Sequence, residues 1–198
     1  MVALIRPDCP NPAALAGDYN SDPTYSDPIN KDALKKSTFG KCMYCESKIG
    51  HASYPEVEHI KPKIKYPELE FVWENLGSSC PVCNRKKGFN YDESIPFINP
   101  YDEDPETLFM FIDHIIWPKN NSNRAKFTIN SIKLNRDDLI DRRKDKLDDV
   151  RKMINAAKNS IVESLKEQLL VELIEKSGKD KEYSVAVKNL LISQGILK

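Results

Sequence analysis

The sequence predicts an α+β fold, in which a compact module over residues 41–100 precedes a mostly helical C-terminal region. Two C-x-x-C pairs, at residues 42–45 and 80–83, bracket a segment of short apolar runs. An apolar stripe with helical spacing begins near Leu139. The first thirty residues are rich in Pro, Asp, Asn and Ser, which indicates an extended arm with little helix.

Length and composition fit an ordinary globular protein. The chain has 198 residues, enough for one domain with a tail or two small domains. Hydrophobic residues make up 40% and charged residues 30%. Thirty basic and thirty acidic residues give a formal net charge of zero, so nucleic-acid binding would depend on local patches or a partner.

No apolar run approaches the roughly 20 residues that a membrane-spanning helix needs. The opening residues also lack the apolar stretch of a signal peptide. Both observations predict a cytoplasmic protein with no membrane contact. Disulfides are rare in that compartment, which bears on how the cysteines are interpreted.

The cysteines predict a structural zinc site. Four of the five form the two pairs, and each pair can fold into a tight knuckle that presents two thiolates to one tetrahedral ion. A redox C-x-x-C is the alternative, but a second pair and the lack of a thioredoxin-like βαβ pattern favour zinc. The predicted ligands are Cys42, Cys45, Cys80 and Cys83. The fifth, Cys9, is expected to be a free thiol.

Three segments are expected along the chain: an N-terminal arm with a short helix (1–40), the zinc-bearing module (41–100), and a hairpin with C-terminal helices (101–198). We expect the short helix over Lys31 to Thr38, ended by Gly40. A second helix should begin near Pro81, directly after the third cysteine of the pairs.

Beyond the module, the runs FMFIDHIIW (109–117) and KFTINSI (126–132) are apolar enough to be strands. We expect them to form a hairpin across the turn at 118–123.

The C-terminal region is expected to be helical. Asn135 is a predicted N-cap, followed by acidic residues in the first turn and by apolar residues at three- and four-residue steps. The predicted stripe comprises Leu139, Leu147, Val150, Ile154, Ala157, Ile161, Leu165, Leu169 and Leu173. An unbroken helix over this stripe would be about 50 Å long, so we expect a break near Asn159 and Ser160. Asp180 is the predicted cap of a last helix over 181–193.

Between the cysteine pairs lie residues suited to phosphodiester hydrolysis. That reaction needs a base to deprotonate water, a divalent cation to stabilise charge, and a group that orients the base. His59 suits the first role, because a neutral imidazole is common at physiological pH. Glu58 and Asn84 offer oxygen ligands that Mg²⁺ or Mn²⁺ prefers. Adjacent strand residues face opposite sides, so Glu58 and His59 would need a bend to share one site.

These residues resemble the HNH endonuclease pattern in its zinc-bearing ββα-metal form. The strings that carry the resemblance are CMYCE, VEHIKPK, YPELEFVWENL and CPVCNRKKG. More specifically they resemble the PtuB family, the HNH nuclease subunit of the bacterial Septu anti-phage system and of related retron-linked systems. The specific motifs cover about a quarter of the chain.

The resemblance implies a role for each matching position. His59 would be the general base, and Asn75 would fix the loop that orients it. Glu58 would bind the catalytic cation together with Asn84, which stands where many HNH proteins have a last histidine. Five basic residues could contact substrate phosphates: Lys87, Arg85, Lys86, Lys61 and Lys63. Lys61 and Lys63 could equally belong to a solvated strand edge.

The resemblance further implies double-stranded DNA as substrate and a PtuA-like ATPase as partner. A retron reverse transcriptase with its DNA is a further implied partner. Two other interpretations of the sequence remain open: a non-catalytic zinc-stapled adaptor that binds protein or nucleic acid, and an RNA-cleaving toxin. The adaptor explains the cysteines but leaves Glu58, His59, Asn75 and Asn84 unexplained.

Overall fold

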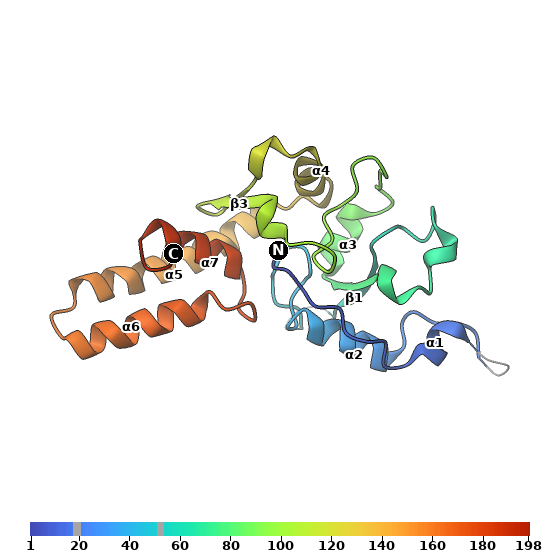
Figure 1. The fold of residues 1–198 in the computed structure, drawn as a ribbon, viewed down its shortest axis with the longest axis horizontal. Helices are drawn as coiled ribbons and strands as arrows, with labels where there is room; N and C mark the ends of the chain where they lie inside the picture. The colour runs from blue at the N-terminus through green and yellow to red at the C-terminus, as the bar shows by residue number, and fades with distance from the viewer. Residues whose placement is uncertain (18–20, 51–53) are drawn as a thin grey trace.

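The computed structural model describes residues 1–17, 21–50 and 54–198 and confirms the mixed α+β fold (Figure 1). Two small antiparallel hairpins are surrounded by helices, and α5, α6 and α7 lie on the opposite side of the molecule from α1 and α2 (Figure 1). His51, which the sequence marks as a surface or structural residue, lies outside the described residues. Within the described part, no helix is both long and apolar enough to cross a membrane.

The N-terminal arm holds α1 (Pro12–Ala16) and α2 (Pro28–Ser37). The expected helix after residue 31 is confirmed but starts three positions earlier. Asp27 is the reason, because its side chain accepts hydrogen bonds from the first free amides of α2 and Pro28 occupies the first helical position. The arm is not loosely attached, since Arg6 donates to the carbonyls of Trp73 and Leu76.

Glu58 and His59 lie on a hairpin of β1 (Glu56–His59) and β2 (Leu76–Ser79), which pair antiparallel. Helix α3 (Pro81–Lys87) follows directly, as the sequence predicts, and the structure shows that it packs against β1. On the other face, a second apolar cluster joins the hairpin to the arm. Its buried members are Leu15, Leu34, Trp73 and Leu76. The hairpin is therefore sandwiched between the arm and α3.

Four 3-10 helices complete the connections: η1 (Pro67–Leu69), η2 (Trp73–Asn75), η3 (Pro105–Thr107) and η4 (Lys119–Asn121). The first cysteine knuckle packs directly on β2, where the Met43 amide donates to the carbonyl of Ser78. Gly77 leaves room for the Met43 side chain at this contact. A Cβ atom there would come 2.5 Å from the sulfur of Met43, closer than real contacts allow.

The expected second hairpin is placed wrongly by the sequence. Its two strands are β3 (Phe109–Ile112), which lies within the first apolar run, and β4 (Ile115–Pro118), which extends one residue beyond it. The turn forms at Asp113, whose φ of 56° is the left-handed value that short hairpin turns need. The second run, 126–132, is not a strand but lies in helix α4 (Asn123–Ile132), capped by Ser122.

The C-terminal region comprises α5 (Asp137–Asn159), α6 (Glu163–Lys176) and α7 (Ser184–Ser193). The predicted break is confirmed, because α5 ends at Asn159 and α6 runs back beside it (Figure 1). The stripe is buried from Leu139 to Ala157. The burial of the stripe is interrupted at the break between α5 and α6, where Ile161 is 99% exposed.

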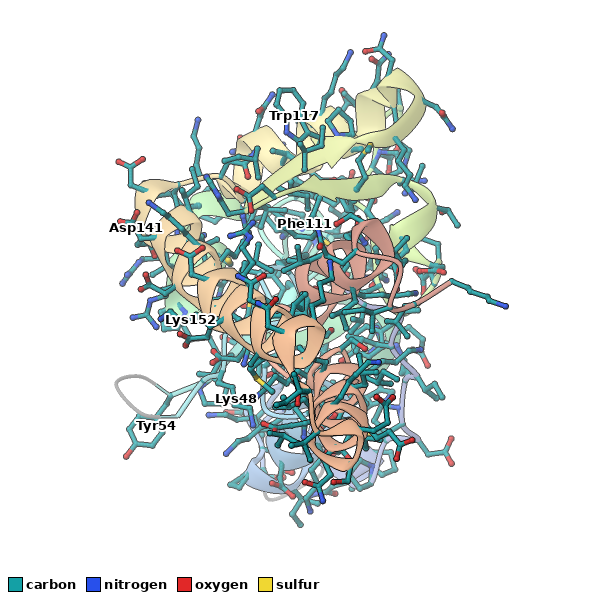
Figure 2. All side chains as sticks on the ribbon, turned by 90° about the vertical axis from the view of Figure 1, so that its left-hand side faces the viewer. Lys48, Tyr54, Phe111, Trp117, Asp141 and Lys152 are labelled. Atoms are coloured by element: carbon teal, nitrogen blue, oxygen red, sulfur yellow. The ribbon has the colours of Figure 1, made fainter. Side chains whose placement is uncertain are left out.

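Both predicted caps of this region are wrong. Asn135 does not cap α5, because its side chain is bonded to the backbone of Ile116 in β4. Asp180 does not cap α7, since its carboxylate pairs with Lys181 and the helix begins only after Tyr183. Figure 2 shows Phe111 between the β3–β4 hairpin and these helices, where Arg143 of α5 lies 5.3 Å from its ring.

Buried charges tie the cysteine knuckle to α7. Glu46 is 2% exposed and accepts hydrogen bonds from the amide and hydroxyl of Ser184. Burial alone would raise its pKa, but the N-terminal ammonium of Met1 and Lys41 outweigh that effect and lower the pKa to about 2. One apolar core also connects the cysteine knuckles to the C-terminal helices, with members from Met1 to Leu191.

Candidate functional site

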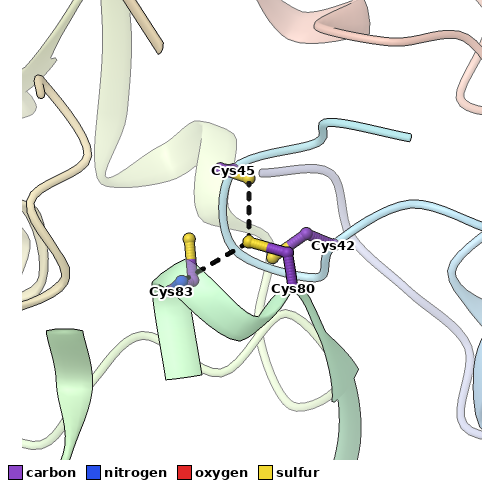
Figure 3. A group of neighbouring side chains, drawn as sticks. All are labelled: Cys42, Cys45, Cys80 and Cys83. Carbon is purple, nitrogen blue, oxygen red and sulfur yellow. Dashed lines mark hydrogen bonds between the residues drawn. The ribbon is translucent and has the colours of Figure 1, made fainter. Parts of the chain in front are cut away.

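The four paired cysteines converge on one point. Their sulfur atoms all lie within 4.8 Å of one another, and Cys45 and Cys80 are 3.9 Å apart (Figure 3). Four thiolates about 2.3 Å from a tetrahedral zinc would be about 3.8 Å apart, whereas a disulfide requires about 2 Å. The cluster therefore has the dimensions of a zinc site. Cys9 lies outside it, with its thiol 3.5 Å from the Asn30 side chain.

The four thiols do not share one pKa shift. Hydrogen bonding from Cys42 lowers the pKa of Cys45 and of Cys80, whereas burial raises the pKa of Cys42, and hydrogen bonding with Cys42 raises the pKa of Cys83. Arg136 places its guanidinium 3.5 Å from the sulfur of Cys83. A fixed positive charge beside anionic sulfur offsets part of the charge that four thiolates leave on a Zn²⁺ complex.

His59 ends β1, and its imidazole faces the arm and the loop before η2. Its Nε2 atom lies 3.0 Å from the carbonyl oxygen of Glu70. A carbonyl only accepts, so Nε2 must carry the hydrogen and Nδ1 keeps a lone pair. Burial lowers the pKa of His59, which keeps the ring neutral near physiological pH. The arrangement leaves one basic nitrogen on an oriented ring, as a general base needs.

Glu58 faces α3 instead. Its carboxylate is fully buried and is bonded to the Lys87 ammonium at 2.6 Å and the Tyr44 hydroxyl at 3.3 Å. Burial raises its pKa, an effect that Lys87 and Tyr44 partly cancel. The sequence predicts Lys87 at a substrate phosphate, yet Lys87 is 1% exposed and also donates to the carbonyl of His59. Lys87 thus connects α3 to both residues of the Glu58–His59 pair.

We expect Lys87→Met to lower the free energy of unfolding by about 3–5 kcal/mol, because it leaves the Glu58 carboxylate buried without its counter-ion. Urea denaturation of the zinc-loaded protein measures the change. Lys86→Met is the matched control, since Lys86 is exposed on the same helix and should cost less than about 0.5 kcal/mol. Equal urea midpoints for the two variants would contradict this role of the buried pair.

Asn84 lies on α3 and is bonded through its side-chain nitrogen to the carboxylate of Glu56, 2.8 Å away. Both residues line a cleft of about 560 Å³, together with Tyr25 and Lys31 of the arm. Tyr54 lies at the same cleft and is 89% exposed; Figure 2 shows it projecting from the body of the molecule. Glu56 is not among the site residues that the sequence predicts. Its position two residues before Glu58, on the same face of a strand, is the signal that could have identified it.

Asn75 clamps the loop that surrounds His59. Its side chain accepts from the Lys61 amide and donates to the carbonyls of Lys61 and Leu69. It makes no hydrogen bond to His59 among the described residues, so any effect on the imidazole passes through the loop that carries Glu70.

The oxygen donors fit a hard divalent cation. Glu58 Oε2 is buried and has no hydrogen-bond partner among the described residues, which is costly unless a ligand satisfies it. Glu58 is paired with the Lys87 ammonium, whereas Glu56 lies at the cleft that Lys31 also lines. His59 and Glu58 face opposite sides of β1, as strand geometry requires, and the regular pairing of β1 shows no bend between them.

The remaining basic candidates differ in their surroundings. Arg85 and Lys86 are exposed on α3. Lys61 lies over the Tyr66 ring and near Glu93. Lys63 is bonded to Glu70 and Tyr25. Only the first two therefore have ammonium or guanidinium groups that no described contact engages.

Comparisons with known proteins identify the family to which the chain is similar. Residues 42–90, which hold both knuckles, the β1–β2 hairpin and α3, match the family of HNH endonucleases. The chain is 34% identical to the Septu protein PtuB of Bacillus thuringiensis over 143 residues, which cover 68% of this chain and 55% of that relative. It is 32% identical to the Septu protein PtuB of Bacillus mycoides (strain KBAB4), with 84% of this chain and 66% of that relative covered.

The chain spans 55% of the length of the first of these relatives and 66% of the second. The identities extend well beyond the HNH segment, because the longer match covers most of the described fold. The chain therefore belongs to the PtuB family of HNH proteins.

Proposed function

We propose that the chain is a metal-dependent endonuclease that hydrolyses phosphodiester bonds in DNA. The single observation that carries the proposal is the state of His59. Its Nε2–H is held by the carbonyl of Glu70, so that Nδ1 is the free base, within a segment that matches HNH endonucleases. A non-catalytic adaptor would not need an imidazole held in one tautomer.

In the proposed reaction, His59 Nδ1 takes the proton from the attacking water. Asn75 holds the loop that keeps the Glu70 carbonyl against Nε2. A bound Mg²⁺ or Mn²⁺ supplies electrostatic stabilisation of the phosphoryl and leaving oxygens. Glu58 Oε2, the side-chain oxygen of Asn84 and the carboxylate of Glu56 would hold it on the face of β1 opposite His59. The phosphate would therefore have to lie at the strand edge, in the cleft that Tyr25, Glu56 and Asn84 line, to meet both the cation and the base. The four cysteines would hold a separate structural Zn²⁺.

The substrate would lie in the cleft beside Asn84 and Glu56, with Arg85 and Lys86 reaching its phosphates. The net charge of zero gives little general affinity for DNA, so a second subunit would supply affinity or control. We propose that this subunit is a PtuA-like ATPase in a bacterial anti-phage complex, in the cytosol, where thiols stay reduced for zinc.

Asn84→Ala is expected to abolish cleavage of duplex DNA at about 1 mM Mg²⁺ and to regain part of it when Mg²⁺ or Mn²⁺ is raised, because it weakens cation binding and leaves the base in place. Glu56→Gln and Glu58→Gln should behave alike if all three hold one cation. Cleavage at the parental rate by Asn84→Ala, without added cation, would contradict the metal assignment. Cleavage of RNA but not DNA would favour the toxin interpretation.

The tip of the α5–α6 pair supports the proposed partner. Ile161, Val162 and Leu165 are 99%, 51% and 47% exposed there. We expect Leu165→Asp to abolish co-purification with the ATPase, since a charge in an apolar interface costs several kcal/mol. Ile64→Asp, at an exposed apolar residue of the HNH segment, is the control and should leave binding intact. Unchanged binding by Leu165→Asp would place the interface elsewhere.

A further inference from the structure

A closed set of contacts surrounds His59, and one of its members, Tyr25, comes from the N-terminal arm. His59 Nε2 is held by the carbonyl of Glu70, and the Glu70 carboxylate is bonded to the Lys63 ammonium at 2.6 Å. Lys63 also donates to the Tyr25 hydroxyl at 3.1 Å. The Tyr25 ring returns to His59, which it meets edge-on with ring centroids 4.7 Å apart and an interplanar angle of 82°.

Each contact restricts the next one. The Lys63 ammonium lies 4.4 Å from the centre of the Tyr25 ring, so it engages that residue through both ring and hydroxyl. The ion pair with Lys63 fixes the Glu70 side chain, and the backbone amide of Glu70 donates to the carbonyl of Pro67. A residue held at both ends presents its carbonyl in one direction. That direction decides which nitrogen of His59 carries the hydrogen.

We propose that Tyr25 and Lys63 are positioning residues for His59: together with Glu70 they hold the imidazole in the Nε2–H tautomer, and Lys63 serves this circuit rather than a substrate phosphate. The inference rests on the proposed role of His59 as a base. Its physical content, the restraint on the ring, exists whether or not the chain cleaves DNA. The N-terminal arm then forms one side of the candidate site, because Tyr25 also lines the cleft that Glu56 and Asn84 line.

Two variants separate the circuit from simple packing. Tyr25 belongs to the apolar cluster of Trp73 and Leu76 through its ring, which Tyr25→Phe retains while the hydroxyl is lost. Lys63→Met keeps the aliphatic stem and removes the ammonium. The matched controls are Tyr66→Phe, whose hydroxyl is bonded to Glu93, and Lys65→Met, whose ammonium lies near the carbonyl of Tyr91. Both controls lie in the same loop region but not in the contacts around His59.

The first measurement is the ¹⁵N NMR spectrum of the zinc-loaded full chain, labelled at its three histidines, with His59→Ala used for assignment. We expect His59 to be a single Nε2–H tautomer in the parent and in both controls. Lys63→Met and Tyr25→Phe should convert it to a mixture. Because both act on one circuit, the double variant should resemble Lys63→Met alone. An unchanged tautomer in both variants would overturn the proposal.

The second measurement is steady-state cleavage of duplex DNA at several salt concentrations. Lys63→Met should lower kcat about 10-fold, which corresponds to about 1.4 kcal/mol, with KM and its salt dependence unchanged. A phosphate contact predicts the opposite: KM rises, and the slope of log affinity against log salt falls by about 1. That result would also overturn the proposal. A parent that shows the single tautomer but cleaves no nucleic acid would refute the nuclease and leave the positioning role standing.

Discussion

Replacing His59 with alanine is expected to lower DNA cleavage at least about 100-fold while fold and zinc content stay unchanged. A general base contributes roughly 10²–10⁴-fold, and alanine removes the Nδ1 lone pair that the Glu70 contact leaves free. The variant should fold because the His59 side chain is only partly buried and its strand is held by the pairing with β2. Single-turnover cleavage, in the presence of the ATPase, measures the effect on the chemical step.

His114→Ala is the matched control. Its imidazole lies on the β3–β4 turn beside Asp113, on a different hairpin from the candidate site. We expect parental cleavage from it. If His59→Ala also cleaved at the parental rate, the catalytic interpretation would fall and the zinc-stapled adaptor would take its place.

The parts of the fold that the sequence predicts are those with local signals. Two C-x-x-C pairs can satisfy a tetrahedral ion only by converging, and the structure brings them together. Proline after Cys80 marks the start of α3, and the long apolar stripe could not remain one straight helix in a chain of this size.

The features that the sequence does not reveal depend on contacts distant in the chain. Asn135 is a good helix cap by type, but the backbone of β4 takes its side chain first. The run at 126–132 has strand-like apolar residues, yet α4 buries the same residues on one helical face against the rest of the core. Tyr25 carries no signal of its own, because its neighbour His59 is brought to it only by the packing of the arm on the hairpin.

Within the candidate site, the burial of individual side chains is what the sequence does not predict. Residue types identify Glu58 and Lys87 as an acid and a base that could each reach a ligand. Neither type reveals that the two are fully buried against each other, which changes Lys87 from an expected phosphate contact into a counter-ion. Glu56, by contrast, stays at the cleft with Asn84. Because side chains alternate along a strand, Glu56 and Glu58 lie on one face of β1. Glu56 is thus an additional oxygen donor beside the predicted Glu58 and Asn84.

Cys80→Ser is expected to abolish the cooperative unfolding transition and to leave the purified chain without its zinc. A structural zinc contributes about 10 kcal/mol or more, which is comparable to the whole net stability of a typical domain. Serine is a good N-cap, so it can replace the sulfur that accepts from the Cys83 amide at the start of α3. The loss can therefore be assigned to the missing thiolate and not to the helix. Circular dichroism during heating and elemental analysis measure the two effects.

Cys9→Ser is the control, since Cys9 lies outside the cluster and should keep one zinc per chain and the parental melting temperature. Zinc loss should also disturb the candidate site, because Met43 of the first cysteine knuckle packs on Gly77, and Gly77 pairs with Glu58. Zinc loss should thus expose the Glu58–Lys87 pair to solvent and end cleavage, whereas a weak chelator that removes only Mg²⁺ should end cleavage and spare the fold. A Cys80→Ser protein with full zinc content and an unchanged melting temperature would refute the structural role of the cluster.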